Sequence, residues 1–292
     1  MTTDFATCHW HSDRRAGVVC QRCDLPICPS CMRQASVGFH CPNCVAKGKQ
    51  KVISGRAAFS AAFTPTLTFA LMGLNIAIFL LGTAVGDQHI LTDFSAIGRA
   101  ILFEQGSSGI TRVDTSHQYY RLLTSGFLHW NIIHIGLNMW ALYNLGPTVE
   151  RALGRLRFGL VYVAALLAGG AGAVIVSPHS LSAGASGALY GLFGALVIVY
   201  RREGIDVMRS GLGISILINF VITVTLPGIS LGGHVGGFVG GLAAAWIAVH
   251  GSQALGSTKA AFVALCALLP LLLALGVLAV SRSSLVGIGI GI

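Results

Sequence analysis

A few polar side chains stand out because they lie inside apolar segments or at the point where one begins. Ser186 opens one such segment, and His234 lies at the start of another. A lone serine in an apolar helix usually bonds to its own backbone, whereas an ionisable side chain in a membrane is rare and usually functional. A serine hydroxyl becomes a competent nucleophile when a neutral histidine within hydrogen-bond reach accepts its proton. The pair Ser186 and His234 therefore indicates nucleophilic catalysis.

Three of these polar side chains share a similar distance from the polar end of their own segment. Ser186 precedes Arg201 by 15 residues, His134 precedes Arg151 by 17, and His234 precedes His250 by 16. With a rise of about 1.5 Å per residue, all three lie about 23–26 Å from one membrane boundary. We therefore expect Ser186, His134 and His234 to meet at one depth, as the members of a site must.

The oxyanion of a tetrahedral intermediate would need preorganised hydrogen-bond donors. The backbone N–H of Ser186 at a helix N-terminus is one candidate, together with the imidazole of His134 and the amide of Asn138. The latter two are four residues apart and share one helix face. No acidic residue occurs at this depth to orient His234, so the sequence predicts a dyad. Tyr190, one turn after Ser186, is expected to stack on the imidazole.

Glycine pairs accompany both candidate catalytic residues. Gly187 and Gly191 follow the serine, and Gly237 and Gly241 follow the histidine, each pair four residues apart. Small residues at this spacing allow two membrane helices to approach backbone to backbone. Glycine pairs alone indicate packing, but here they predict an approach that brings the imidazole to the hydroxyl.

The composition places these segments in a membrane. The 292 residues are 54% hydrophobic and 10% charged, and the mean hydropathy is +0.74. Soluble domains carry about 25% charged residues, so we expect a polytopic membrane protein with the lipid bilayer as its surroundings. Basic residues in such proteins usually encode topology, and the net charge of +9 does not lead us to expect a nucleic-acid partner. The polar, cysteine-rich start does not resemble a secretory signal peptide.

The chain is predicted to be an all-α polytopic membrane protein with seven apolar segments. They cover residues 67–85, 131–148, 158–177, 186–200, 211–226, 233–250 and 260–281. Several are shorter than the ~20 residues that a span requires, which suggests helices beginning below the surface around a wet cavity. The short segment 211–226 is a plausible gate for substrate. The loop 86–130 is expected to fold partly into the membrane interface.

The distribution of basic residues predicts the orientation. Fifteen of the 19 Lys and Arg residues fall on one side of the predicted spans, together with the N-terminus. By the positive-inside rule that side is cytosolic. We therefore expect a multi-pass protein of the cell membrane, with a cytosolic N-terminus and the C-terminus outside.

The N-terminal segment contains eight potential metal ligands arranged as four pairs with two-residue spacing. They are Cys8, His11, Cys20, Cys23, Cys28, Cys31, Cys41 and Cys44. Eight ligands make two tetrahedral zinc sites. Alternating pairs would put Cys8, His11, Cys28 and Cys31 at one site and Cys20, Cys23, Cys41 and Cys44 at the other; sequential pairs would divide them differently. An odd number of cysteines and a reducing compartment argue against a disulfide framework. His40 could replace a ligand, although a surface role fits it better.

The segment of residues 1–46 resembles a B-box-type zinc finger, a fold used mostly for protein contacts. With so few residues it needs the metal for its folding energy. The resemblance implies two structural zinc ions and a cytosolic protein partner or a regulatory role. A basic linker follows over residues 47–65.

The remainder resembles the rhomboid intramembrane serine proteases. The resemblance lies in Gly184-x-Ser186-Gly187, in His234-x-Gly236-Gly237-x-x-x-Gly241, in His129 and His134-x-x-x-Asn138, and in Glu150-x-x-x-Gly154. It implies a six-helix core over residues 66–250, followed by a seventh span and tail over 251–292. It also implies catalysis by Ser186 and His234 without a cofactor, an oxyanion hole with His134 and Asn138, and Tyr190 packed on His234. The implied substrates are transmembrane segments of proteins, cut near the outer face.

Two other functions compete with proteolysis. A catalytically silent rhomboid-like protein would bind membrane clients, but such proteins generally lack the serine or the histidine, and this chain keeps both. A transporter or channel would need charges or broken helices across the midplane. His129, Arg121 and Glu150 are expected to be structural, and Tyr120-Arg121 stands where the rhomboid family typically has Trp-Arg.

Overall fold

The computed structural model describes residues 6–35, 38–47, 64–85, 89–106 and 109–290. The chain divides into two compact units, Met1–Phe63 and Thr64–Ile292. Each unit is described by itself below.

The first unit consists of short antiparallel strand pairs and one short helix. Its elements are β1 (Thr7–Cys8), β2 (His11–Arg15), β3 (Val18–Val19), β4 (Pro26–Ile27), β5 (Arg33–Gln34), β6 (Phe39–His40) and α1 (Pro42–Lys47), with a 3-10 turn at Pro29–Cys31. Strands β1 and β2, β3 and β4, and β5 and β6 form the pairs. The most buried side chains of this unit are five cysteines and Ile27. Cysteines thus take the place of an aliphatic core.

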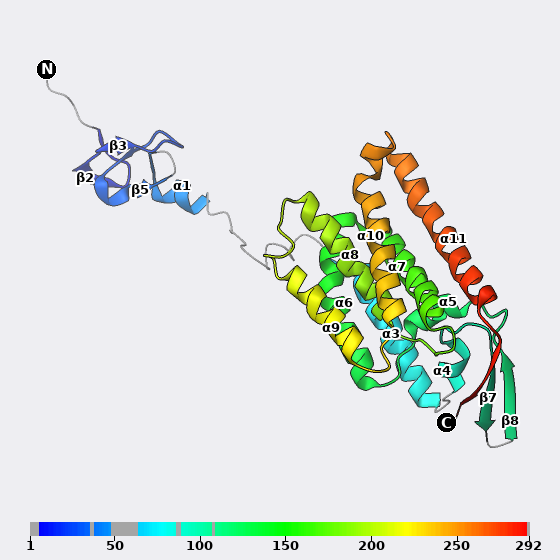
Figure 1. Ribbon diagram of the computed structural model, residues 1–292. Helices are drawn as coiled ribbons and strands as arrows, with labels where there is room; N and C mark the ends of the chain where they lie inside the picture. Colours follow the sequence, from blue (N-terminus) through cyan, green and yellow to red (C-terminus); the bar gives the residue numbers. More distant parts are fainter. Residues whose placement is uncertain (1–5, 36–37, 48–63, 86–88, 107–108, 291–292) are drawn as a thin grey trace. The chain divides into compact units, whose positions relative to one another are not determined.

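The second unit is a bundle of apolar helices, and each of the seven predicted apolar segments lies largely in one of them (Figure 1). The helices are α3 (Thr66–Val85), α6 (Ile132–Leu153), α7 (Arg155–Val176), α8 (Ser186–Arg202), α9 (Leu212–Thr225), α10 (Leu231–Ala254) and α11 (Thr258–Arg282). By length and composition, α3, α7, α10 and α11 could each cross a membrane, and α9 is a shorter apolar helix. The prediction of several apolar helices typical of a polytopic membrane protein is confirmed.

Polar residues set the ends of the helices that carry the candidate site. The Asn131 side chain caps α6 by accepting a hydrogen bond from the backbone N–H of His134 at 2.9 Å. The Ser230 hydroxyl oxygen caps α10 in the same way, by accepting a hydrogen bond from the backbone N–H of Gly233 at 3.1 Å. Gly154, with φ of +78°, ends α6 and lets the chain turn into α7. These caps fix where each helix begins and so fix the rotational position of its side chains.

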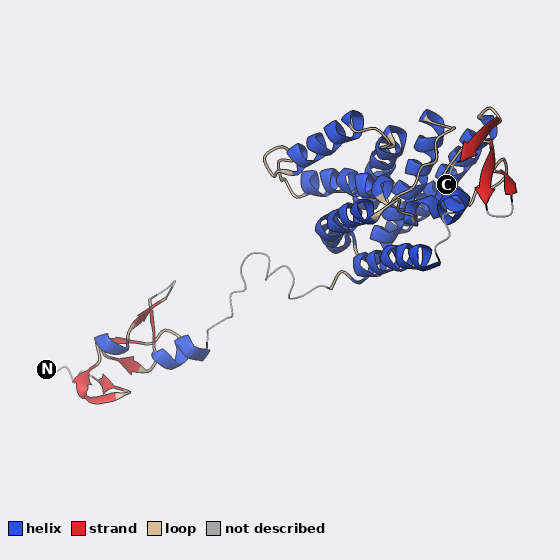
Figure 2. Cartoon of the chain, turned by 90° about the horizontal axis from the view of Figure 1, so that it is seen from below, coloured by secondary structure: helices blue, strands red, loops and turns tan. Residues whose placement is uncertain are grey.

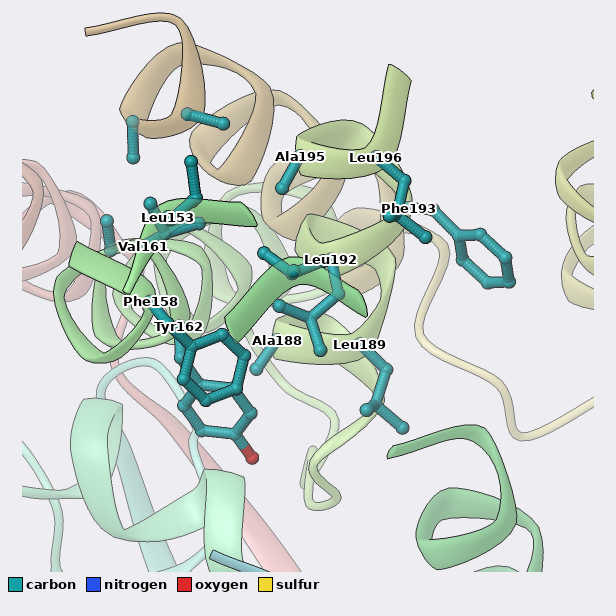
Figure 3. Close-up of a cluster of buried hydrophobic side chains, with 14 of the residues drawn as sticks. Leu153, Phe158, Val161, Tyr162, Ala188, Leu189, Leu192, Phe193, Ala195 and Leu196 are labelled. Atoms are coloured by element: carbon teal, nitrogen blue, oxygen red, sulfur yellow. The ribbon is translucent and has the colours of Figure 1, made fainter. Parts of the chain in front are cut away.

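Helices α7, α8 and α10 form the centre of the bundle, with α6 and α11 packed beside them. The core between them consists of aromatic and branched aliphatic side chains, and Figure 3 shows Phe158 and Tyr162 of α7 together with Leu192 of α8. Helix α9 is different, because half of its residues, among them Leu217 and Val224, are exposed. The central helices therefore form a closely packed scaffold, while α9 lies against its edge.

The all-α prediction is wrong in one respect, because the helical unit also contains a small sheet. Strands β7 (Ala100–Gly106) and β8 (Gly109–Asp114) form an antiparallel hairpin, and β9 (Val286–Ile290) pairs with β7 in parallel. Figure 2 shows this small sheet in red at one end of the helical unit. Its strands come from the loop after α3 and from the tail after α11, two segments far apart in the sequence. Alternating and β-branched residues in both segments are compatible with strands, but only the fold brings them together.

The rest of the first loop contains short helices, α4 (His89–Phe94) and α5 (Arg121–Thr124). The side chain of Arg121 is buried, and its guanidinium donates to the side-chain oxygen of Gln118 at 2.6 Å and to the backbone oxygen of Ser95 at 3.2 Å. These bonds tie α5 to the segment that follows α4.

Candidate active site

Ser186 is the first residue of α8 and follows a strained turn. Gly184 has φ of +130°, a conformation that favours glycine, and its N–H donates to the backbone oxygen of Ser125 at 2.9 Å. The first N–H groups of a helix have no partner within the helix. The turn thus places both the hydroxyl and the free N–H groups of this helix end at the same point.

His234 lies in the first turn of α10, opposite Ser186. Its Nε2 is 2.8 Å from Ser186 Oγ, a hydrogen-bond distance. His234 is 7% exposed, and its ring stacks on Tyr190 with centroids 4.0 Å apart and an interplanar angle of 17°. The structure therefore brings together the two residues that the sequence singled out as nucleophile and base, with Tyr190 beside the base.

The other ring nitrogen of His234 faces a residue that sequence reasoning missed. Nδ1 lies 2.7 Å from Thr223 Oγ1, and the Thr223 hydroxyl donates to the backbone oxygen of Asn219 at 2.8 Å. The Tyr190 hydroxyl lies 2.6 Å from both of these oxygens. Thr223 belongs to α9 and is 3% exposed. A threonine in a short apolar segment is a weak signal, since such residues usually bond to their own helix.

His134 and Asn138 approach the same point from α6. A methyl group on Gly184 would lie 2.8 Å from His134 Nε2 and 3.6 Å from Ser186 Oγ, so the ring of His134 faces the serine across this glycine. The side-chain amide of Asn138 is buried and donates one hydrogen to the backbone oxygen of His134 at 2.9 Å. Its second N–H hydrogen is the one that could face a ligand.

His129 lies behind the site rather than in it. Its ring is buried and contacts the ring of His134 edge to face, with centroids 5.1 Å apart. Through this contact it limits the orientations that the ring of His134 can adopt.

The predicted glycine pairs face each other across α8 and α10. A methyl group on Gly237 would overlap the carbonyl of Gly187, and one on Gly241 would overlap the backbone of Gly191. Only a hydrogen in place of a side chain permits this approach. The resulting backbone contact brings α10 close enough for His234 to reach Ser186.

A cavity of about 550 Å³ opens onto this group of residues. Ser186, His234, His134 and Asn138 line it, together with the connections that precede α8 and α10. A volume of this size lies within the range of small-molecule binding sites. Because Ser186, His134 and Asn138 all line the cavity, a group bound there could contact the serine and the side chains of α6.

The first unit contains two clusters of potential metal ligands. They are Cys8, His11, Cys28 and Cys31, and Cys20, Cys23, Cys41 and Cys44, with the ligand atoms of each cluster within 4.8 Å of one another. The alternating arrangement is therefore present, and neither cluster includes His40. Tetrahedral thiolates at the usual Zn–S distance lie roughly 3.8 Å apart, and Cys23 Sγ and Cys41 Sγ are 3.8 Å apart. All eight cysteines are free of disulfide bonds. The clusters could each hold a metal ion.

Backbone N–H groups favour the thiolate form of Cys20 in the second cluster. The N–H of Cys41 donates to Cys20 Sγ at 3.2 Å. Burial opposes ionisation of Cys20, but backbone hydrogen bonds from Cys41, Arg22 and Cys23 outweigh it and lower the pKa of this thiol to about 6. The thiolate is the form that a metal ion binds, so the low pKa of this thiol favours ligation.

Comparison with known proteins gives one family match, which lies in the helical unit, and several similar relatives. Residues 116–251 match the family described as Rhomboid domain. The chain is 34% identical over 186 residues to rhomboid protease GluP of Bacillus subtilis, covering 62% of this chain and 34% of that protein. It is 29% identical over 143 residues to RHOMBOID-like protein 4 of Arabidopsis thaliana, covering 47% of this chain and 36% of that protein. It is 29% identical over 154 residues to the putative rhomboid protease YdcA of Bacillus subtilis, covering 51% of this chain and 77% of that protein.

The matched region coincides with the residues of the site. It begins before α5 and ends within α10, and so includes Ser186, His234, His134, Asn138 and Tyr190. The chain spans about a third of the length of the first two of these relatives. Residues 116–251 are thus similar in sequence to the rhomboid domain.

Proposed function

We propose that this protein is an intramembrane serine endopeptidase that cleaves transmembrane segments of other membrane proteins. The observation that supports this most directly is the distance of 2.8 Å between Ser186 Oγ and His234 Nε2, at the wall of a cavity within an apolar bundle. The relatives named as rhomboid proteases agree with this chemistry. An ionisable side chain in apolar surroundings is usually functional, and a catalytic role accounts for this hydrogen-bonded serine and histidine.

The reaction proceeds in two halves. In each half, His234 first accepts a proton and then donates it. Ser186 Oγ attacks the scissile carbonyl carbon while His234 Nε2 accepts its proton, and the carbonyl oxygen becomes an oxyanion. The imidazolium then donates this proton to the leaving amine, and the C–N bond breaks. A water molecule next gives its proton to His234 as it attacks the ester. The imidazolium returns the proton to Ser186 Oγ as the C–O bond of the acyl-enzyme breaks.

Donors from two helices would hold the oxyanion. The free N–H of Ser186 at the N-terminus of α8, the ring of His134 and the second amide hydrogen of Asn138 surround one region of the cavity. Such donors act most strongly where water is excluded, because the local dielectric constant is low. Loss of one oxyanion donor typically lowers kcat by about a hundredfold to a thousandfold.

The charge distribution supports one orientation for this site. Most basic residues lie at the end of the bundle opposite Ser186, as in the final turn of α8 with Arg201 and Arg202. By the positive-inside rule that end is cytosolic, so the cavity lies toward the outer face. The N-terminal unit is then in the cytosol and the C-terminus outside.

The experiment is cleavage of transmembrane reporter proteins by the purified full chain in proteoliposomes. Ser186→Ala and His234→Ala are expected to abolish cleavage. Ser215→Ala, which removes an α9 hydroxyl that donates to the Gly211 carbonyl at 2.9 Å, should leave it unchanged. A fluorophosphonate probe should label Ser186 in the same preparations, which tests the nucleophile without a substrate.

Cleavage that survives Ser186→Ala would exclude this mechanism. An unlabelled and inactive native chain would instead favour the role of a silent protein that binds membrane clients.

The N-terminal unit has a separate proposed role. We propose that its two clusters each bind a zinc ion that holds the short strands in place, and that the folded unit binds a cytosolic protein partner or regulates proteolysis. The clusters support the metal, because a unit with so small an apolar core gains its folding energy from ligation. The test is deletion of residues 1–50 in cells. Unchanged interactions and unchanged substrate turnover would contradict the partner role.

A further inference from the structure

The inference rests on the proposed function and concerns the side of His234 that faces away from Ser186. We propose that Thr223 is a positioning residue that fixes the tautomer of His234, with its proton on Nδ1. The unprotonated Nε2 then faces Ser186 and can accept the hydroxyl proton. The catalytic group would thus have three members from three helices, with a threonine hydroxyl in the orienting place.

The first step of the argument is the number of hydrogens available to Thr223. Its hydroxyl has one hydrogen, and the backbone oxygen of Asn219 lies 2.8 Å away in donating geometry. With that hydrogen committed, Thr223 Oγ1 can only accept on its remaining sides. Its contact with His234 Nδ1 at 2.7 Å is then a bond in which Nδ1–H donates. A neutral imidazole has one N–H, so Nε2 must be the acceptor.

Tyr190 is compatible with the same assignment. Its hydroxyl donates to Asn219 O at 2.6 Å and lies 2.6 Å from Thr223 Oγ1. The Asn219 carbonyl oxygen has two lone pairs, so it can accept the hydrogens of both Tyr190 and Thr223. Tyr190 therefore does not displace the hydrogen of Thr223 from this oxygen.

A neighbouring threonine shows that the contact with His234 is not a general consequence of helix chemistry. Thr225, two residues further along α9, donates to the backbone oxygen of Val221 at 2.7 Å and is exposed. It makes the same bond to its own helix as Thr223 does. Only Thr223 of this pair is buried and reaches the imidazole. Its position therefore serves His234 in addition to the helix.

A hydroxyl is a suitable orienting group at this depth. A carboxylate would have to be desolvated, which costs more than its attraction to a neutral imidazole returns. The hydroxyl accepts from Nδ1–H both in the resting imidazole and in the imidazolium, so no proton passes to Thr223. Because about half of the residues of α9 are exposed, the packing of α9 against α10 determines whether this bond exists.

The experiment compares Thr223→Val, which keeps the shape but removes the hydroxyl, with Thr223→Ser, which keeps the hydroxyl. Thr225→Val is the matched control, because it removes the same kind of bond to the helix backbone. Reporter cleavage by Thr223→Val should fall in kcat by about tenfold to a hundredfold, in keeping with loss of one bond to an ionising group, with little change in KM. Thr223→Ser should restore most of kcat, and Thr225→Val should match the native chain.

The tautomer is measured directly by NMR on the native full chain in detergent with 15N-labelled histidine. We expect His234 to carry its proton on Nδ1, and we expect Thr223→Val to give a mixture of tautomers. A proton on Nε2 in the native chain, or native kcat in Thr223→Val, would overturn the inference. The NMR readout needs no substrate, so it separates failure of this inference from failure of the protease assignment, which labelling of Ser186 reports.

Discussion

Thr68, in the first turn of α3, donates its hydroxyl hydrogen to Glu150 Oε2 at 2.7 Å. The same carboxylate also accepts the backbone N–H of Leu67 at 3.0 Å and of Thr68 at 2.8 Å. Glu150 is 0% exposed and lies near the end of α6. Its carboxylate therefore satisfies the unpaired N–H groups at the start of α3, a helix that is adjacent in space but distant in sequence.

Glu150→Ala is expected to destabilise the protein by about 3 kcal/mol, because it leaves buried N–H groups without an acceptor. Thermal unfolding of the purified chain in detergent measures the effect. Glu203→Ala, which removes an exposed carboxylate 3.9 Å from Arg202, should change stability by less than about 0.5 kcal/mol. Residual cleavage should follow the folded fraction. Loss of cleavage in Glu150→Gln without loss of stability would mean that this residue has a chemical role.

Tyr190→Phe separates the stacking of this ring on His234 from the hydrogen bonds of its hydroxyl. The phenylalanine ring can still stack at the observed 4.0 Å, while the bonds to Asn219 and Thr223 are lost. We expect kcat to fall about twofold to tenfold, the effect of one neutral hydrogen bond. Tyr190→Ala removes the stack as well and should be the more severe change. Equal kcat values for both variants would show that stacking contributes nothing.

Gly241→Ala tests the close contact between α8 and α10. The added methyl group overlaps the backbone of Gly191, so the helices must separate, and we expect a loss of stability of about 1–3 kcal/mol together with loss of cleavage. Gly73→Ala on α3 is the control, because a methyl group there meets nothing within 4 Å. Native melting temperature and cleavage in Gly241→Ala would contradict the packing described here.

The full chain purified without chelator should contain two zinc ions, measured by mass spectrometry of the metal content. Cys20→Ser removes one ligand of the second cluster, and we expect it to lower the content to about one. His40→Ala should retain both ions. Cleavage of a reporter in proteoliposomes should survive chelation, because the proposed reaction uses no metal. A content of one or none in the native chain would contradict the two-site assignment.

The sequence by itself predicted most of the membrane unit for a physical reason. Apolar runs must be helical in a bilayer, so their positions could be read directly, and polar residues within them were few enough to single out. The spacing of Ser186, His134 and His234 along separate helices predicted a common depth, and the glycine pairs predicted which helices would touch. The structure places these residues together, with Ser186 and His234 at hydrogen-bond distance.

Tertiary structure decided the contacts between distant segments that carry no sequence signal of one another. Pairing of β9 with β7, and capping of α3 by Glu150, join parts of the chain whose sequences carry no signal of one another. The alternating division of the eight metal ligands required the path of the strands, because either division satisfies the spacing. Thr223 became distinct from Thr225 only when α9 packed against α10, because the rotation of a helix determines which of two similar hydroxyls is buried beside His234.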